Sequence, residues 1–136
     1  MQQRWTNWSI FALEKELFFG FYIIRKLIEL RRVPIDTIEN TFSIIDIPLE
    51  NARSVFEENP DLSKIIIGSG KRVNLNLQAI CNQFIHSQRL YPLIINSIFV
   101  GLLVCSDYKY KSGIYLITVF NVAEIYRQVG RSHPVA

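Results

Sequence analysis

The feature that most constrains this chain is a long apolar helix near its N-terminus. Residues 17–24 read Leu-Phe-Phe-Gly-Phe-Tyr-Ile-Ile, inside a helical pattern that runs from about Trp8 to Arg32. A surface helix keeps one polar face for water, and the middle of this helix has no such face. We therefore expect other apolar groups to cover it on two or more sides.

A second copy of the protein is the expected cover for part of this helix. Burying a Leu, Ile or Phe side chain stabilises a protein by about 1.5–3 kcal/mol, so several such residues on one exposed patch favour association. The commonest solution is a two-fold contact between identical chains. We expect the following residues to form the core or the dimer contact: Leu17, Phe18, Phe21, Tyr22, Ile24 and Ile28.

The composition is typical of a globular protein in a reducing compartment. The chain of 136 residues predicts a single domain spanning 1–136, with 49% hydrophobic and 20% charged residues. A mean hydropathy of +0.17 fits a subunit with an apolar contact surface. The two cysteines, Cys81 and Cys105, have apolar neighbours, which indicates buried thiols rather than a disulfide.

The distribution of charge argues against several classes of partner. The net charge of +3 is mild, whereas nucleic-acid binders show denser positive charge on one side. The N-terminus lacks the charged start, apolar middle and small-residue cleavage site that make up a signal peptide, in that order. A membrane span needs about 20 largely uncharged residues, but charged residues at 14–16 and 25–26 bound the apolar run. We therefore expect a cytoplasmic protein without membrane contact.

Beyond the first helix, the sequence predicts short helices and strands. We expect helices at about 49–58, from 74 or 76 to 87, and at 121–129, the last capped by Asn121, and strands at about 42–47, 64–67, 97–106 and 114–119. The last two strands form a hairpin. The predicted fold is α+β: the long N-terminal helix and shorter helices pack on a small, mainly antiparallel sheet of three to four strands.

The predicted helix that ends near residue 87 has one apolar face and one polar row. Asn82 and His86 follow each other at i+4 spacing on the polar row. With Asn82 beside it, His86 could act as a general base if a carboxylate such as Asp46 or Asp107 oriented it. We favour a histidine that bonds a backbone carbonyl, because no catalytic motif surrounds it. The apolar face is formed by Leu77, Ile80, Cys81 and Phe84.

The tip of the predicted hairpin alternates aromatic and basic residues: Tyr108, Lys109, Tyr110 and Lys111. In a strand this alternation places the tyrosines on one face and the lysines on the other. Tyrosines can stack on nucleic-acid bases while lysines contact phosphates. A solvated hairpin end explains the same residues, so nucleic-acid binding is the less favoured interpretation.

No motif in the sequence predicts a cofactor or a metal ion. The segment Gly-Ser-Gly-Lys at 68–71 is incomplete as a phosphate-binding loop, because Ile65 and Arg72 stand where that loop needs glycine and a hydroxyl residue. The cysteines and histidines match no zinc-binding spacing. We therefore predict neither a cofactor nor a metal site.

Several short segments occur in an order that resembles a known group of proteins. Residues 21–29 read Phe-Tyr-Ile-Ile-Arg-Lys-Leu-Ile-Glu, and residues 82–87 read Asn-Gln-Phe-Ile-His-Ser. A late hairpin carries Ser106-Asp107 and Gly-Ile-Tyr at 113–115, before a helix that ends with Val129-Gly130. This order resembles a loose group of small uncharacterised bacterial proteins from integron gene cassettes and other mobile elements. The resemblance implies a bacterial, cytoplasmic accessory protein and no particular activity.

These observations lead to one functional prediction and two alternatives. The prediction is a non-enzymatic small cytoplasmic binding or accessory protein that acts as a homodimer. The first alternative is a small enzyme that uses His86 with Asn82 and a nearby carboxylate. The second is nucleic-acid binding through the basic and aromatic hairpin tip at residues 108–111.

Overall fold

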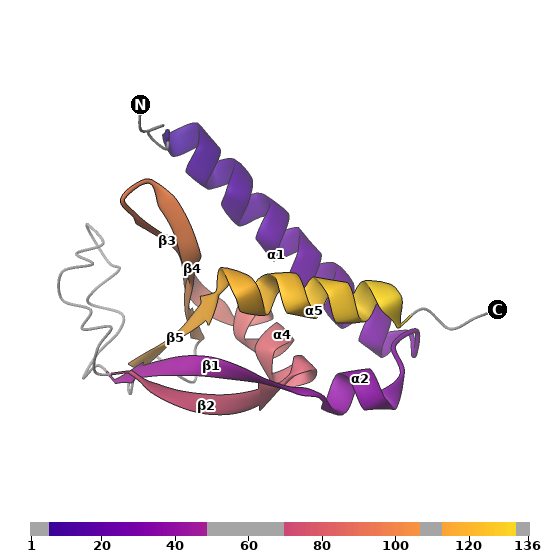
Figure 1. Cartoon of the computed structure of the whole chain (residues 1–136). Helices are drawn as coiled ribbons and strands as arrows, with labels where there is room; N and C mark the ends of the chain where they lie inside the picture. Colours follow the sequence, from indigo (N-terminus) through magenta and orange to yellow (C-terminus); the bar gives the residue numbers. More distant parts are fainter. Residues whose placement is uncertain (1–5, 49–69, 107–112, 133–136) are drawn as a thin grey trace.

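The computed structural model describes residues 6–48, 70–106 and 113–132. Within these ranges, five antiparallel strands form one sheet in the order β2-β1-β5-β4-β3 (Figure 1). The strands are β1 (Thr41–Pro48), β2 (Lys71–Asn76), β3 (Ser87–Ile95), β4 (Ile98–Ser106) and β5 (Gly113–Thr118). The predicted α+β class is confirmed, whereas the predicted number of three to four strands is wrong.

The two strands that the sequence did not predict, β2 and β3, are the outermost strands of the sheet. In β2, Val73 and Leu75 are half-buried and alternate with exposed polar residues, as in a strand with one covered face. The third strand contains Pro92, which has no N–H group for a ladder hydrogen bond. An edge position tolerates proline because one side of the strand needs no partner.

In the described ranges four helices accompany the sheet: α1 (Asn7–Glu29), α2 (Ile35–Glu39), α4 (Leu77–Ile85) and α5 (Val119–Arg131). None of them is long and apolar enough to cross a membrane, within the residues that the structure describes. Three predicted segments lie outside the described residues: the helix at 49–58, the strand at 64–67 and the hairpin tip at 107–111.

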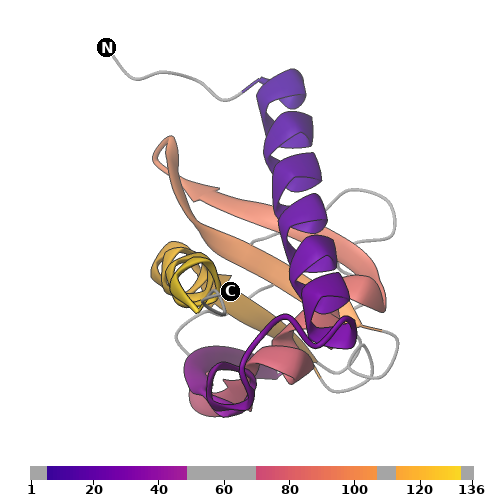
Figure 2. The same cartoon turned by 90° about the vertical axis from the view of Figure 1, so that its right-hand side faces the viewer.

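The first helix begins where Thr6 caps it, because the Thr6 hydroxyl accepts a hydrogen bond from the Ser9 N–H at 3.0 Å. The helix is about 35 Å long at 1.5 Å per residue. Its first buried side chain among the described residues is Leu17. The N-terminal half therefore forms an arm that extends beyond α4 and α5 (Figure 2).

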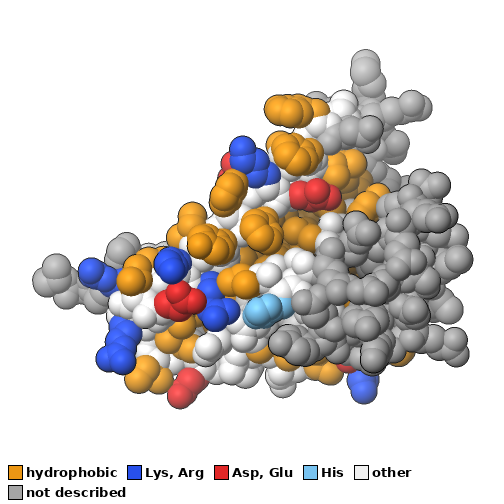
Figure 3. Space-filling model, turned by 180° about the vertical axis from the view of Figure 1, so that it is seen from behind, with side chains coloured by type: hydrophobic (Ala, Val, Ile, Leu, Met, Phe, Trp, Pro, Cys, Tyr) orange, Lys and Arg blue, Asp and Glu red, His pale blue; other side chains and the backbone are white. Residues whose placement is uncertain are grey.

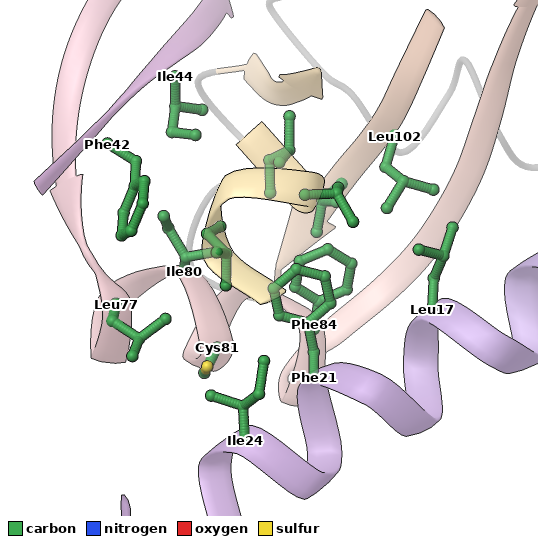
Figure 4. Close-up of a cluster of buried hydrophobic side chains, with 14 of the residues drawn as sticks. Leu17, Phe21, Ile24, Phe42, Ile44, Leu77, Ile80, Cys81, Phe84 and Leu102 are labelled. Carbon is green, nitrogen blue, oxygen red and sulfur yellow. The ribbon is translucent and has the colours of Figure 1, made fainter. Parts of the chain in front are cut away.

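The main core lies between the sheet and α1, α4 and α5. Phe21 of α1 stacks on Phe84 of α4 with ring centroids 3.8 Å apart and planes 7° from parallel (Figure 4). The predicted apolar face of α4 is confirmed, since its four residues are buried. The buried members of this core that Figure 4 labels are Leu17, Phe21, Ile24, Phe42, Ile44, Leu77, Ile80, Cys81, Phe84 and Leu102.

A second, smaller cluster lies on the other face of the sheet. Successive residues of a strand point to opposite faces, so Leu102 belongs to the main core and Leu103 to the second cluster. The strand predicted at about 97–106 is covered on both faces, because β4 is fully buried from Gly101 onward. The buried members of the second cluster are Ile47, Leu93, Leu103, Cys105, Ile114 and Leu116.

The last helix begins earlier than the sequence predicts. Thr118, rather than Asn121, is the N-cap, and the two residues exchange hydrogen bonds. The Thr118 hydroxyl accepts from the Asn121 N–H, and the Asn121 side-chain oxygen accepts from the Thr118 N–H, both at 3.2 Å. This reciprocal capping satisfies backbone donors that the helix itself leaves without partners.

The contact between α1 and α5 explains a glycine in the middle of α1. A Cβ atom at Gly20 would collide with the phenol hydroxyl of Tyr126. The Tyr126 ring also lies 5.5 Å from the ring of Phe21. The glycine therefore makes room for an aromatic side chain of the neighbouring helix.

Candidate functional site

α1 and its C-cap leave large apolar side chains open to solvent. Leu17, Phe21 and Ile24 are buried and Ile28 is half-buried, whereas the other two predicted contact residues are exposed. We name the exposed set the α1 apolar surface. Its members are between 42% and 74% exposed: Trp8, Phe11, Phe18, Phe19, Tyr22, Ile23 and Leu30.

These residues share one side of the helix, where the exposed charged residues Lys15, Lys26 and Glu29 are interspersed with them. At 3.6 residues per turn they span an arc of about 140°, on the side away from the buried stripe. Figure 3 shows apolar side chains gathered in a band on this face of the molecule. Single exposed apolar residues are ordinary, whereas a group of this size on one side of a helix is a candidate contact surface for a protein, a membrane or a ligand.

The size of the band can be compared with known interfaces. A fully covered aromatic side chain buries 150–250 Å², so the exposed fractions of the five aromatic residues amount to roughly 400–700 Å². A stable interface buries about 800 Å² on each partner. The aromatic residues of α1 alone therefore supply at least half of the area that a specific complex needs.

A groove lies on each side of α1. The α1–β3 groove, of about 350 Å³, is formed by five residues of α1 and by Leu90 of β3: Phe11, Glu14, Lys15, Phe18, Phe19 and Leu90. Desolvation in this region raises the pKa of Glu14 above its ordinary value. The Lys15 ammonium lies 5.9 Å from the centre of the Phe19 ring, in cation–π range.

The α1–α5 groove lies on the opposite side of α1. It has a volume of about 290 Å³ and is almost entirely apolar, with the hydroxyl of Tyr126 at its edge. Burial raises the pKa of Tyr126 to about 12, with smaller contributions from Cys81 and Glu16, so this hydroxyl is neutral at physiological pH. The lining residues are Gly20, Ile23, Ile24, Leu27, Tyr126, Val129 and Gly130.

Of the predicted catalytic residues, Asn82 lies against the first helix. The side-chain oxygen of Asn82 accepts a hydrogen bond from the guanidinium of Arg25. The other side of that guanidinium faces Glu29, with 3.3 Å between Arg25 Nε and Glu29 Oε1. Asn82 therefore links α4 to α1 through Arg25. The carboxylate beside Arg25 is that of Glu29, which is also on α1.

His86 is the exposed C-cap of α4, and its backbone N–H donates to the Asn82 carbonyl at 2.9 Å. Asp107, the third catalytic candidate, lies outside the described residues, as do Tyr108, Lys109, Tyr110 and Lys111. In the part of the chain that the structure describes, no three His, Cys, Asp or Glu side chains are placed to hold a metal ion.

The Arg25–Asn82 contact leads to a stability prediction. We expect Asn82→Ala to lower the free energy of unfolding by about 1–2 kcal/mol, because a half-buried guanidinium loses a charge-assisted hydrogen bond. Urea unfolding followed by circular dichroism measures this loss. Gln78→Ala, an exposed position on the same helix, is the control and should change stability by no more than about 0.5 kcal/mol. Equal losses in both variants would show that the contact contributes nothing.

Comparison of the chain with protein-family models, with curated proteins and with solved structures gives no match. The functional conclusion therefore depends on the described surface itself.

Sequence reasoning pointed to α1, which carries most of the candidate surface, but did not indicate the groove residues outside it. Leu90 lies on a strand that the sequence did not predict, and Val129 appeared only at the end of the predicted last helix. A signal that could have found the α1–α5 groove is the helical glycine Gly130, where a Cβ atom would meet nothing within 4 Å, whereas the space beside Gly20 is filled by Tyr126.

Proposed function

We propose that this chain is a small, non-enzymatic cytoplasmic binding or accessory protein that acts as a homodimer through the α1 apolar surface. The observation that carries the proposal is the α1 apolar surface, in which seven large apolar side chains on one side of α1 and its C-cap are exposed. A role as a bacterial accessory protein is supported by the resemblance to proteins of integron gene cassettes and mobile elements.

The charges of α1 favour a protein partner over an anionic one. Its three basic residues are balanced by three acidic ones: Arg25, Lys15 and Lys26 against Glu14, Glu16 and Glu29. A surface that binds nucleic acid or an anionic membrane carries a clear excess of positive charge. A neutral amphipathic helix pairs readily with an identical neutral helix, because no net repulsion opposes the burial of the apolar band.

Molar mass in solution tests the proposal. We expect light scattering at micromolar concentration to give twice the 15.9 kDa of one chain. Phe19→Glu places a charge in the middle of the band and should weaken the dimer by roughly 30-fold or more, because the loss of an interface aromatic costs about 2 kcal/mol or more. Intact monomer folding is checked by circular dichroism.

The matched control is Phe120→Glu. Phe120 is 83% exposed on α5, away from both grooves that flank α1. The same chemical change at this position should leave the molar mass of the dimer unaltered. A wild-type protein that stays monomeric at 100 μM, or a Phe120→Glu variant that dissociates as readily as Phe19→Glu, would contradict the proposal.

A further inference from the structure

The net positive charge of the chain comes from one short segment at the C-terminal end of α1. Residues 25–32 carry four basic side chains and one carboxylate, a net charge of +3. The whole chain has 15 basic and 12 acidic residues, which is also +3, so the charges of all the other residues sum to zero. A local excess of this kind attracts groups of the opposite sign.

A closed turn fixes the two arginines that follow α1. Arg31 has a φ of +57°, in the left-handed region. Its N–H donates to the Ile28 carbonyl at 3.0 Å, and the N–H of Arg32 donates to the Leu27 carbonyl at 2.9 Å. These are the two hydrogen bonds of a Schellman motif. Val33 comes next and is buried, so the backbone that carries both arginines is anchored on each side.

Arg31 occupies a position where glycine is the usual residue. A Cβ atom disfavours the left-handed conformation, so this backbone would be more stable without a side chain. Residues held in such conformations cluster at functional sites. Both Arg31 and Arg32 are exposed, and neither makes an ion pair or a side-chain hydrogen bond with any residue that the structure describes. Their guanidinium donors are therefore available to a partner.

Apolar side chains and a third arginine accompany this turn. We name residues 30–35 the arginine turn. Leu30 begins it at 60% exposed, and Ile35 ends it at 69% exposed. Arg131 of α5 is also exposed, and its neighbour Gly130 lines the α1–α5 groove together with Leu27. Figure 3 shows basic and apolar side chains next to one another at the left-hand end of the molecule, with acidic side chains among them.

The acidic side chains of α2 indicate which kind of anionic partner fits. Asp36 and Glu39 are exposed and follow the arginine turn directly. A bilayer or a nucleic-acid backbone presents phosphates across its whole extent, so it would meet these carboxylates as well as the arginines. A protein segment can place carboxylates opposite the arginines and apolar side chains opposite Ile35. The planar guanidinium also binds a carboxylate through two parallel hydrogen bonds, and arginine is enriched in protein interfaces.

We propose that the arginine turn, together with Arg131, binds an acidic segment of another protein. Carboxylates of that segment pair with the guanidiniums of Arg31 and Arg32, and an aliphatic side chain covers Ile35. This inference goes beyond the homodimer, because neither Arg31 nor Arg32 belongs to the α1 apolar surface.

Fluorescence anisotropy with a labelled peptide of glutamate and leucine residues, at physiological ionic strength, tests the proposal. We expect the double variant Arg31→Ala, Arg32→Ala to weaken peptide binding by roughly 10-fold or more, the effect typical of lost interface arginines. The matched control is Lys71→Ala with Arg72→Ala, which removes another exposed pair of adjacent basic residues, on β2. It should change the affinity by less than about 3-fold.

Two further variants separate binding from folding and from general charge. Arg31→Gly relieves the left-handed backbone, so it should raise the thermal midpoint of unfolding while it weakens peptide binding. The double variant Arg31→Lys, Arg32→Lys keeps both charges but loses the planar donors, so it should bind the peptide more weakly than the wild-type protein does.

The outcomes distinguish this inference from the proposed homodimer. It is overturned if the wild-type protein does not bind the peptide, or if the β2 pair matters as much as the arginine pair. Tighter binding of single-stranded DNA or phosphatidylserine vesicles than of the peptide, lost when both arginines are replaced, would assign the turn to phosphates and reject a protein partner. A wild-type protein that binds the peptide as a monomer would contradict the homodimer and leave this inference standing.

Discussion

Phe21→Ala should be the most destabilising single substitution among the described residues of α1, with a loss of about 3–5 kcal/mol in the free energy of unfolding. Its side chain has no exposed surface and stacks on Phe84 at the point where α1, α4 and α5 meet. Truncation removes apolar burial and leaves a cavity that the surrounding helices cannot fill. Since native domains are stable by about 5–15 kcal/mol, this loss is a large share of the total.

Phe18→Ala is the control, because it makes the same chemical change one turn earlier on the same helix. Phe18 is 42% exposed in a single protomer. We expect a loss of about 1 kcal/mol or less when urea unfolding is measured below the dissociation constant of the dimer, where association adds nothing to stability. Similar losses for the two variants would contradict the assignment of the buried stripe.

The second large effect is a loss of stability in alkali that depends on Cys81. Burial raises the pKa of this thiol to about 12, although Arg25 acts in the opposite direction. An unfolded cysteine titrates near pH 8.5–9. Between these values the folded protein keeps a proton that the unfolded chain has lost, so stability is full below about pH 8.5 and falls as pH rises toward 12. The expected slope is about 1.4 kcal/mol per pH unit.

Urea unfolding at intervals from pH 8 to pH 11 measures this slope. Cys81→Ala removes the titrating thiol, so its stability should depend less steeply on pH even if the substitution itself costs some stability. Tyr126→Phe controls for the phenol that interacts electrostatically with Cys81, whose pKa is also raised to about 12. The assignment to Cys81 fails if the wild-type protein and Cys81→Ala lose stability in parallel.

The sequence predicted those parts of the fold where local pattern and tertiary environment agree. The four apolar residues of α4 share one face of a short helix, and all are buried. The limits of prediction are clearest within α1. Phe18 and Phe21 are identical residues three positions apart, yet one is 42% exposed and the other is fully buried. A helix that is apolar all round has no polar side to indicate which residues face the core.

The missed elements have physical explanations as well. Pro92 argues against a central strand, and only the edge position of β3 makes it acceptable. Thr and Asn are both preferred N-cap residues, so the sequence does not show whether Thr118 or Asn121 caps the helix. In the structure Thr118 is the N-cap and Asn121 bonds back to it. The α1–α5 groove depends on the packing of residues about 100 positions apart, which no local pattern records.

The long sequence separation of contacting elements also determines when the apolar side chains of this protein become buried during synthesis. β1 pairs with β5, and the central register joins Ile45 to Leu116, about 70 residues later in the chain. Phe21 leaves the ribosome long before Phe84 and Tyr126, which cover it in the finished protein. At 5–20 residues per second, translation of the intervening chain takes roughly 5–20 seconds. During that interval the aromatic residues of the first helix lack their later cover, which exposes the nascent chain to co-translational aggregation.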